Sequence, residues 1–244
     1  MIVAAVPVKD LVNAKQRLVR VLEPEERAEL ARAMLRDVLK VLTAARLDRV
    51  WVVTREAGVT VIAREFGVEA LSEAENRGHT AAVALAQATA EQRGARAFLT
   101  VPGDVPCVSA DEIEALRALV AERAPAAVLV PSRSGLGTNG VALTPPAAMP
   151  LTFGEPSFEN HLAAARRRGL APRVLSLPGL SLDIDNADDL LALLREGAHT
   201  ESGRLLARWP IAARLAPDEP ERRLGRRNPV LWEVSEGAAE TPSD

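Results

Sequence analysis

The feature that most constrains this chain is the alternation of short, continuous apolar runs with longer segments of helical period. The apolar runs read IVAAVPV (2–8), RVWVVT (49–54), AFLTVP (97–102) and AAVLVPS (126–132). Between them lie amphipathic segments such as PEERAELARAMLRDVLKVLTAA (24–45) and ADEIEALRALVAE (110–122). Strands that are apolar on both faces, with helices between them, indicate a mostly parallel sheet covered on both sides. The predicted fold class is therefore doubly wound α/β.

Helix signals support this interpretation. Pro24 suits a first helical turn, Ser109 and Glu112 have the spacing of a capping box, and Gly169 is placed to end a helix. From about residue 135 the pattern loosens into GLGTNGVALTPPAAMPLTFGEPSF, which predicts a binding loop or a β-hairpin insertion. An apolar hairpin around residues 141–151 could also pair with a second copy of the chain.

Length and composition favour a single soluble domain. The chain has 244 residues, of which 48% are hydrophobic, and we expect a core domain over 1–197. We expect residues 198–244 to form a C-terminal extension with a short helix and then a flexible tail. A net charge of -3 and the absence of a leader or spanning pattern predict a cytoplasmic protein that binds neither nucleic acid nor membrane. Cys107, alone in the sequence, cannot form an internal disulfide and is expected to be structural.

Ligands of open parallel sheets bind beyond the carboxyl ends of the strands, so the residues that follow each run are the candidates for a site. These residues are Lys9, Lys15 and Arg17, then Asn76, Gly78 and His79, then Asp104, and finally Asp183 and Asp185.

The aspartates suggest a metal site. Asp183 and Asp185 stand two residues apart in LDID, so an extended backbone directs both toward the same side. Together with Asp104 they would form a cluster of hard oxygen ligands suited to Mg²⁺, with cations nearby for a polyphosphate. The alternative is that Asp185 or Asn186 caps the following helix and Asp104 is a turn residue that bonds its own backbone.

The sequence lacks the motifs of P-loop NTPases, of ordinary dehydrogenases and of G-x-S-x-G hydrolases. The sequence has no G-x-x-x-x-G-K-[ST], no G-x-G-x-x-G after the first strand and no G-x-S-x-G. Its three histidines, His79, His161 and His199, have no metal-binding spacing and are expected on a helix surface or in the core. A reaction that needs no general base remains compatible, such as attack of an ionised phosphate on the α-phosphorus of a nucleotide.

Five stretches resemble a known family when they are taken in order. They are PVKDLVNAKQRL, VPGDVPCVSADEIEAL, GTNGVALTPP, FGEPSFENHLAAARRRGL and LDIDNADDL, within residues 1 to about 196. They resemble the phospholactate or phosphoenolpyruvate guanylyltransferases of deazaflavin coenzyme F-420 biosynthesis. The resemblance implies a nucleotidyltransferase fold of the glycosyltransferase-A type. It also implies transfer of GMP from GTP to a small phosphorylated acid, with Mg²⁺ as cofactor and pyrophosphate as leaving group.

The resemblance also implies roles for particular residues. Asp104, Asp183 and Asp185 would hold the metal, with Asp104 and Lys15 catalytic. Lys15 would bind a phosphate of the nucleotide, and the positions of Lys9, Arg17, Asn76 and Gly78 after the strands make them candidates for binding the nucleotide as well. Thr138, Gly154 and Ser157 would bind the acceptor, and Ser157 stands at an expected helix start that attracts anions, unless it is a plain N-cap.

Other interpretations stay open at this stage. PVKDLVNAK replaces the glycine-rich nucleotide loop of many nucleotidyltransferases, and His79 stands where a smaller or amide residue is expected. The acceptor could be phosphoenolpyruvate, 2-phospho-L-lactate or 3-phosphoglycerate, and the downstream transferase that consumes the product is a candidate partner. The alternatives are a sugar-nucleotide or molybdenum-cofactor nucleotidyltransferase and a non-catalytic nucleotide-binding module.

Overall fold

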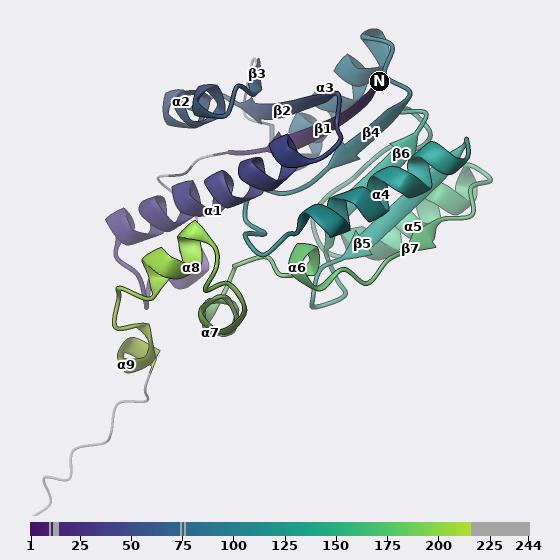
Figure 1. The fold of residues 1–244 in the computed structure, drawn as a ribbon. Helices are drawn as coiled ribbons and strands as arrows, with labels where there is room; N and C mark the ends of the chain where they lie inside the picture. Colours follow the sequence, from purple (N-terminus) through teal and green to yellow (C-terminus); the bar gives the residue numbers. More distant parts are fainter. Residues whose placement is uncertain (10, 12–14, 74, 76, 216–244) are drawn as a thin grey trace, which may run out of the picture.

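The structure is a computed structural model that describes residues 1–215 except 10, 12–14, 74 and 76. Its strands form one seven-stranded sheet in the order β3-β2-β1-β4-β6-β5-β7 (Figure 1). The strands are β1 (Ile2–Pro7), β2 (Arg49–Thr54), β3 (Glu69–Ser72), β4 (Ala97–Thr100), β5 (Ala126–Pro131), β6 (Thr138–Thr144) and β7 (Arg173–Val174). The pairs β1–β2, β1–β4, β2–β3 and β5–β7 are parallel, which confirms the mostly parallel sheet.

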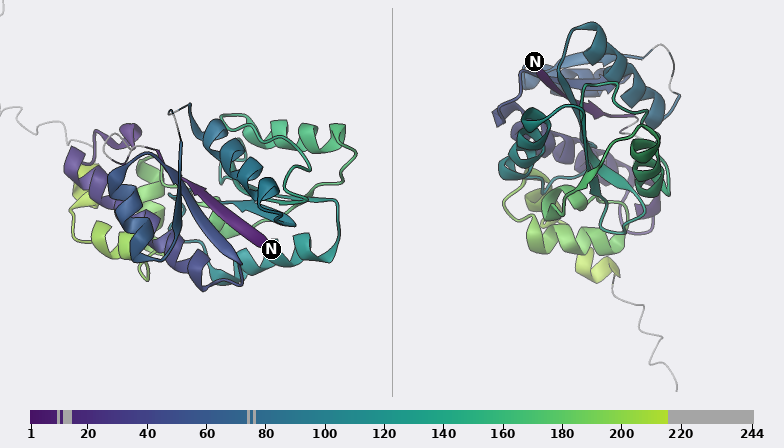
Figure 2. Two further views of the ribbon diagram at one scale, coloured as in Figure 1. Left: turned by 90° about the horizontal axis from the view of Figure 1, so that it is seen from above. Right: turned by 90° about the vertical axis from the view of Figure 1, so that its right-hand side faces the viewer.

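Helices cover both faces of the sheet, as the apolar strands require. One face packs against α1 (Pro24–Ala44), α2 (Ala57–Glu65) and α4 (Ala110–Glu122). The other packs against α3 (His79–Gln92) and α5 (Ser157–Arg167). Figure 2 shows the sheet between these two layers. The two hydrophobic cores are separate, because the side chains of each strand alternate between them.

The predicted helix signals occur where expected. Pro24 is the first residue of α1. Ser109 is the N-cap of α4, where its hydroxyl accepts from the Glu112 N–H and the Glu112 carboxylate accepts from the Ser109 N–H. Gly169 follows α5 with φ 69°, a left-handed conformation that glycine adopts without strain.

The strand order places a crevice at the carboxyl ends of β1 and β4. Strand β1 pairs with β2 along one edge and with β4 along its other edge. The loops that follow β1 and β4 therefore diverge and leave space between them. This is the topological switch point, where open α/β sheets bind their ligands.

The predicted β-hairpin is present, but it lies earlier in the chain than residues 141–151. Strands β5 and β6 form it, and residues 145–156 contain no strand. The strand β6 runs antiparallel between β4 and β5, so both of its edges are paired and it cannot pair with a second copy. Because β6 runs against β4, its first residues, Thr138 and Asn139, lie at the edge of the sheet where β4 ends.

The chain then passes through α6 (Pro178–Ser181) and α7 (Ala187–Glu196) to α8 (Glu201–Leu206) and α9 (Ile211–Leu215). The Asp37 carboxylate in α1 accepts hydrogen bonds from the backbone N–H groups of Glu201 and Ser202 and from the Ser202 hydroxyl, at 2.7–2.9 Å. These bonds attach α8 to α1. From residue 216 onward, the predicted tail lies outside the described residues.

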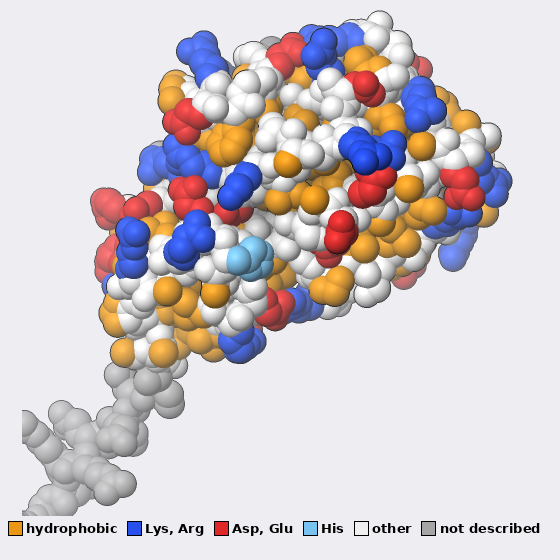
Figure 3. Space-filling view, viewed as in Figure 1, with side chains coloured by type: hydrophobic (Ala, Val, Ile, Leu, Met, Phe, Trp, Pro, Cys, Tyr) orange, Lys and Arg blue, Asp and Glu red, His pale blue; other side chains and the backbone are white. Residues whose placement is uncertain are grey.

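The surface shows no dominant charge on the face seen in Figure 3, where basic and acidic side chains are interspersed. In the part of the chain that the structure describes, no helix combines the length and the apolar character that crossing a membrane requires.

Candidate functional site

The three predicted acidic residues come from two loops that meet at the switch point. Asp104 lies in the loop after β4, and Asp183 and Asp185 lie between α6 and α7. The Ile184 N–H donates to the backbone carbonyl of Asp104 at 3.1 Å, which fixes one loop against the other. The acidic segment is not part of a strand, contrary to expectation. Its burial nevertheless alternates, with Leu182 and Ile184 fully buried, so Asp183 and Asp185 emerge on the same side.

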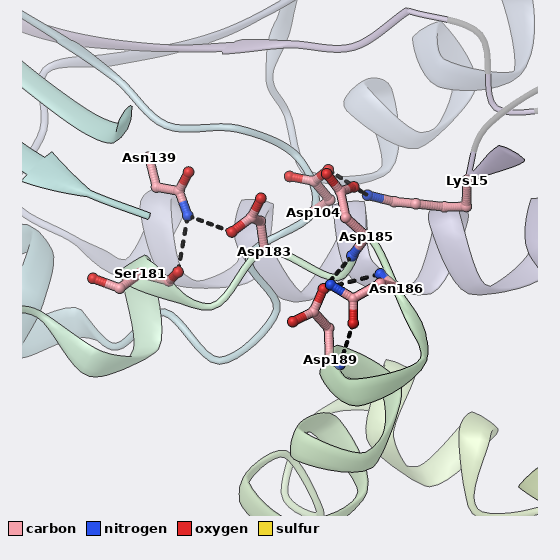
Figure 4. A network of polar contacts seen from close by, with 8 residues as sticks. All are labelled: Lys15, Asp104, Asn139, Ser181, Asp183, Asp185, Asn186 and Asp189. Atoms are coloured by element: carbon pink, nitrogen blue, oxygen red, sulfur yellow. Dashed lines mark hydrogen bonds and ion pairs between the residues drawn. The ribbon is translucent and has the colours of Figure 1, made fainter. Parts of the chain in front are cut away.

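Lys15 joins two of these acids. Its Nζ donates to Asp104 Oδ2 at 2.5 Å and to Asp185 Oδ1 at 2.9 Å (Figure 4). Burial alone would lower the pKa of Lys15, but the two carboxylates outweigh burial and raise it. Lys15 has φ 57°, a left-handed conformation shared by no other non-glycine among the described residues. Strain of this kind is tolerated where the surroundings require a particular side-chain position.

Asp183 and Asp185 differ in their electrostatic surroundings. Burial raises the pKa of Asp183, and the charges of Asp104 and Asp185 add to the increase. The Asn139 amide opposes them by donating from Nδ2 to Asp183 Oδ1 at 3.0 Å, and a hydrogen bond from the Asp183 backbone acts in the same direction. Burial also acts to raise the pKa of Asp185, but the Lys15 ammonium outweighs it and lowers the pKa. Asp183 is thus a partly buried carboxylate that forms no ion pair with the described residues, and a nearby cation would stabilise its ionised form.

The donor set suits a hard divalent cation, because the loops gather three carboxylates. Within the described residues, however, no group of three acidic, histidine or cysteine side chains is arranged to hold a metal ion. The Lys15 ammonium instead supplies the cation that contacts Asp104 and Asp185. Magnesium at Asp104, Asp183 and Asp185 stays a prediction.

One pocket, of about 200 Å³, opens between the ends of β1 and β4. Its polar lining consists of Lys9, Lys15, His79 and Asp104, and α1 contributes an apolar wall with Ala31, Met34 and Leu35. We call it the lysine pocket. Two lysines beside an apolar wall suit a phosphorylated ligand with an apolar part.

A second pocket, of about 240 Å³, lies on the other side of Asp104. It contains the three predicted acceptor-binding residues, Thr138, Gly154 and Ser157, together with Asp183 and Asp185. We call it the hydroxyl pocket. The two pockets share His79, Pro102 and Asp104. The site is therefore a pair of adjoining pockets with Asp104 at the boundary.

The remaining predicted nucleotide-binding residues are less close together. Arg17 is exposed on a short 3₁₀ helix (Gln16–Leu18) and lines neither pocket, although its charge helps to lower the pKa of Asp185. Gly78 is the N-cap of α3 with φ 97°, and a side chain there would begin 3.6 Å from Lys9 Nζ. Asn76 lies outside the described residues.

Thr138, Gly154 and Ser157 lie together in the hydroxyl pocket, and their role in binding the acceptor stays a prediction. Ser157 is the first residue of α5, whose N-cap is Pro156, so the plain N-cap alternative for Ser157 is wrong. The Ser157 hydroxyl donates instead to Thr138 Oγ1 at 3.3 Å. Gly154 has φ 106°, which favours glycine in the loop before α5.

Sequence reasoning missed Asn139 and gave His161 no role. Asn139 is buried at the start of β6 and donates to Asp183 and to the Ser181 carbonyl. An asparagine beside the apolar run GVALT is unusual in a strand and could have drawn attention. His161 is also buried, as the core expectation allowed, but it contacts the hydroxyl pocket through Thr138. Burial lowers the pKa of both His79 and His161 to about 4.

The chain is similar to known guanylyltransferases along most of its length. A family model described as "Guanylyl transferase CofC like" matches residues 2–224, and thus extends past residue 196, where we placed the end of the resemblance. A phosphoenolpyruvate guanylyltransferase of Rubrobacter xylanophilus is 41% identical over 194 residues, which cover 80% of this chain and 94% of that protein. A 2-phospho-L-lactate guanylyltransferase of Methanothermobacter thermautotrophicus is 34% identical over 203 residues, covering 83% and 86%.

The fold is shared more widely. The solved structure of a protein from Desulfovibrio desulfuricans G20, assigned as a nucleotide-diphospho-sugar transferase, superposes with a TM-score of 0.69 at 17% identity. That alignment covers 85% of this chain and 94% of the other. The fold is thus that of nucleotidyltransferases of the nucleotide-diphospho-sugar transferase type. From the family match over most of its length, this chain belongs to the guanylyl transferase CofC-like family.

Proposed function

We propose that this protein transfers GMP from GTP to the phosphate of phosphoenolpyruvate and releases pyrophosphate. The observation that supports this most is the pair of pockets that adjoin at Asp104. The lysine pocket suits a nucleoside triphosphate, and the hydroxyl pocket suits a small acid. Relatives named phosphoenolpyruvate guanylyltransferase favour this acceptor. The 2-phospho-L-lactate guanylyltransferase at 34% identity makes 2-phospho-L-lactate the second candidate.

In this reaction an ionised phosphate oxygen of the acceptor attacks the α-phosphorus of GTP. A new P–O bond forms, the bond to the β-phosphate bridging oxygen breaks, and its electron pair leaves with pyrophosphate. The nucleophile is already ionised, so no side chain needs to remove a proton. The neighbouring histidines suit such a step, because their pKa values of about 4 keep them neutral at pH 7.

Different residues of the chain would bind the triphosphate and the phosphorylated acid. Lys9 and Lys15 would neutralise the triphosphate, and the α3 N-terminus after Gly78 would add its free N–H groups. Thr138, Gly154 and Ser157 would hold the acceptor so that its phosphate faces the lysine pocket. Alignment and charge stabilisation would carry the catalysis.

We further propose that the enzyme uses Mg²⁺, held by Asp104, Asp183 and Asp185. The ion would supply positive charge to the triphosphate when bound. The raised pKa of Asp183 supports this role, since a cation there would offset the cost of burying the carboxylate. Chelation with EDTA should abolish turnover, and added Mg²⁺ should restore it. Full turnover without a divalent ion would remove this part of the proposal.

The proposed product is a diphosphate in which a new P–O–P bond joins GMP to the phosphate of the acid, and a downstream transferase of deazaflavin coenzyme F-420 biosynthesis would consume it. The test combines each of the four nucleoside triphosphates with phosphoenolpyruvate, 2-phospho-L-lactate, 3-phosphoglycerate, sugar phosphates and a molybdenum-cofactor precursor, and measures pyrophosphate release. We expect release with GTP and phosphoenolpyruvate. Release only with sugar phosphates or a molybdenum-cofactor precursor would indicate a different nucleotidyltransferase. Nucleotide binding without release for any acceptor would indicate a binding module.

A further inference from the structure

His161 makes two hydrogen bonds that fix which of its ring nitrogens carries the proton. The backbone N–H of Thr152 donates to Nε2 at 3.0 Å, so Nε2 must be the unprotonated nitrogen. The other nitrogen, Nδ1, then carries the hydrogen and donates to Thr138 Oγ1, also at 3.0 Å. Only 1% of His161 is exposed, so water does not compete for these contacts. A pKa of about 4 keeps this neutral form in place at neutral pH.

The consequence falls on the Thr138 hydroxyl. Its oxygen receives one hydrogen bond from His161 Nδ1 and a second, at 3.3 Å, from the Ser157 hydroxyl. A hydroxyl group has one hydrogen to donate and two lone pairs that accept. Because both lone pairs are occupied, the Thr138 hydroxyl can bind a ligand only by donating. Thr138 lines the hydroxyl pocket, where such a donor selects an anionic oxygen.

The same histidine also stabilises the loop before α5. The Thr152 N–H that it accepts lies two residues before Gly154, and the Phe153 ring packs edge-on against His161 with centroids 5.0 Å apart. From the opposite side, Thr80 Oγ1 accepts from the Phe153 N–H at 2.9 Å. His161 therefore contacts both the loop before α5 and the Thr138 hydroxyl, and both of these line the hydroxyl pocket.

We propose that His161 is a positioning residue that makes the Thr138 hydroxyl an obligatory hydrogen-bond donor to an anionic oxygen of the phosphorylated acid. This inference rests on the proposed function. The affinity for the phosphorylated acid would then depend on a buried side chain that does not touch this substrate. Nucleotide affinity should not depend on it, because His161 does not line the lysine pocket.

Two near-isosteric variants separate the two bonds. In His161→Gln the terminal amide can still accept from Thr152, but no group remains at the Nδ1 position to donate to Thr138. In His161→Asn the amide nitrogen can occupy the Nδ1 position, while the Thr152 bond is lost. Thr138→Val removes the hydroxyl itself, and His199→Gln serves as a control because His199 is exposed. Melting temperatures and both Michaelis constants are measured for each variant.

We expect His161→Gln to raise the KM for phosphoenolpyruvate about ten- to a hundredfold and to leave the KM for GTP within about threefold. His161→Asn should cause a smaller increase, and His199→Gln none. The double variant Thr138→Val/His161→Gln should be no worse than Thr138→Val alone, because both changes act on one interaction. A purely structural histidine would instead lower the melting temperature and raise both Michaelis constants together.

The inference is overturned if His161→Gln keeps the wild-type KM for phosphoenolpyruvate, or if its effect adds fully to that of Thr138→Val. A wild-type protein that transfers GMP to no phosphorylated acid would overturn the proposed function itself. These failures are distinguishable, because the first two require an active wild-type enzyme.

Discussion

Replacing Asn139 should weaken catalysis by removing the hydrogen-bond donor that stabilises the ionised form of Asp183. The Asn139 Nδ2 lies 3.0 Å from Asp183 Oδ1 and only 6% of the residue is exposed, so water cannot readily replace the bond. A hydrogen bond to a charged group contributes about 1.5–3 kcal/mol. If that free energy is lost from the transition state, kcat/KM falls by about ten- to a hundredfold in Asn139→Ala.

The pH dependence provides a second, more specific readout. Burial already holds the pKa of Asp183 above its usual range, and Asn139 acts to lower it. Without Asn139 the pKa should rise further, so a larger fraction of Asp183 is protonated at a given pH. If Asp183 must be ionised for turnover, the acid limb of the kcat/KM profile should move to higher pH. The assay is pyrophosphate release from GTP and phosphoenolpyruvate, measured from pH 5 to 9.

Two further variants sharpen the test. Asn139→Asp keeps the side-chain shape but replaces the donor with a second negative charge, so it should lose more activity than Asn139→Ala. Asn160→Ala changes an exposed asparagine of α5 and should leave the profile unchanged. A wild-type kcat/KM and an unmoved acid limb in Asn139→Ala would show that the Asn139 hydrogen bond does not stabilise ionised Asp183 during turnover.

Three other substitutions give distinct outcomes. Lys15→Met should lower kcat at least about a hundredfold, because it removes the ammonium between two carboxylates, and steady-state turnover within threefold of wild type would contradict this. Asp183→Asn should abolish pyrophosphate release yet melt above the wild type at pH 7. A carboxyl whose pKa is raised on folding stabilises the protein below its unfolded pKa and loses that contribution as pH rises. The increase in melting temperature caused by Asp183→Asn should therefore become smaller at acid pH. Gly179→Ala should destabilise the fold by at least about 1–3 kcal/mol in urea unfolding, since the new Cβ would lie 2.1 Å from the Cys107 carbonyl oxygen. Gly58→Ala, where nothing lies within 4 Å, is its control, and an equal effect of the two changes would argue against the clash.

Much of the fold could be predicted because local signals and the global pattern agree. The apolar strands, the first turn at Pro24 and the capping box at Ser109 each depend on nearby residues, and all are present. The direction of β6 could not be predicted, because its apolar sequence suits either orientation in a buried sheet. That direction brings Thr138 and Asn139 to the site.

The candidate site was only partly predictable for a related reason. Asp183 and Asp185 emerge on one side, as the two-residue spacing indicates, although their backbone is a loop. The contact of Lys15 with Asp104 and Asp185 brings together residues 89 and 170 positions apart, and no local pattern encodes it. His161 looked like an ordinary core residue because its role depends on partners contributed by other segments.

The most direct test of the account follows the phosphorus atoms of GTP. GTP carrying a radiolabel at the α-phosphorus is incubated with the protein, Mg²⁺ and phosphoenolpyruvate, and the products are separated. We expect the α-label to enter a diphosphate that joins GMP to the phosphorylated acid, while a γ-label in a parallel reaction leaves with pyrophosphate. An α-label recovered only in GTP, GDP or GMP, with a γ-label transferred to the phosphorylated acid or to water, would contradict this transfer.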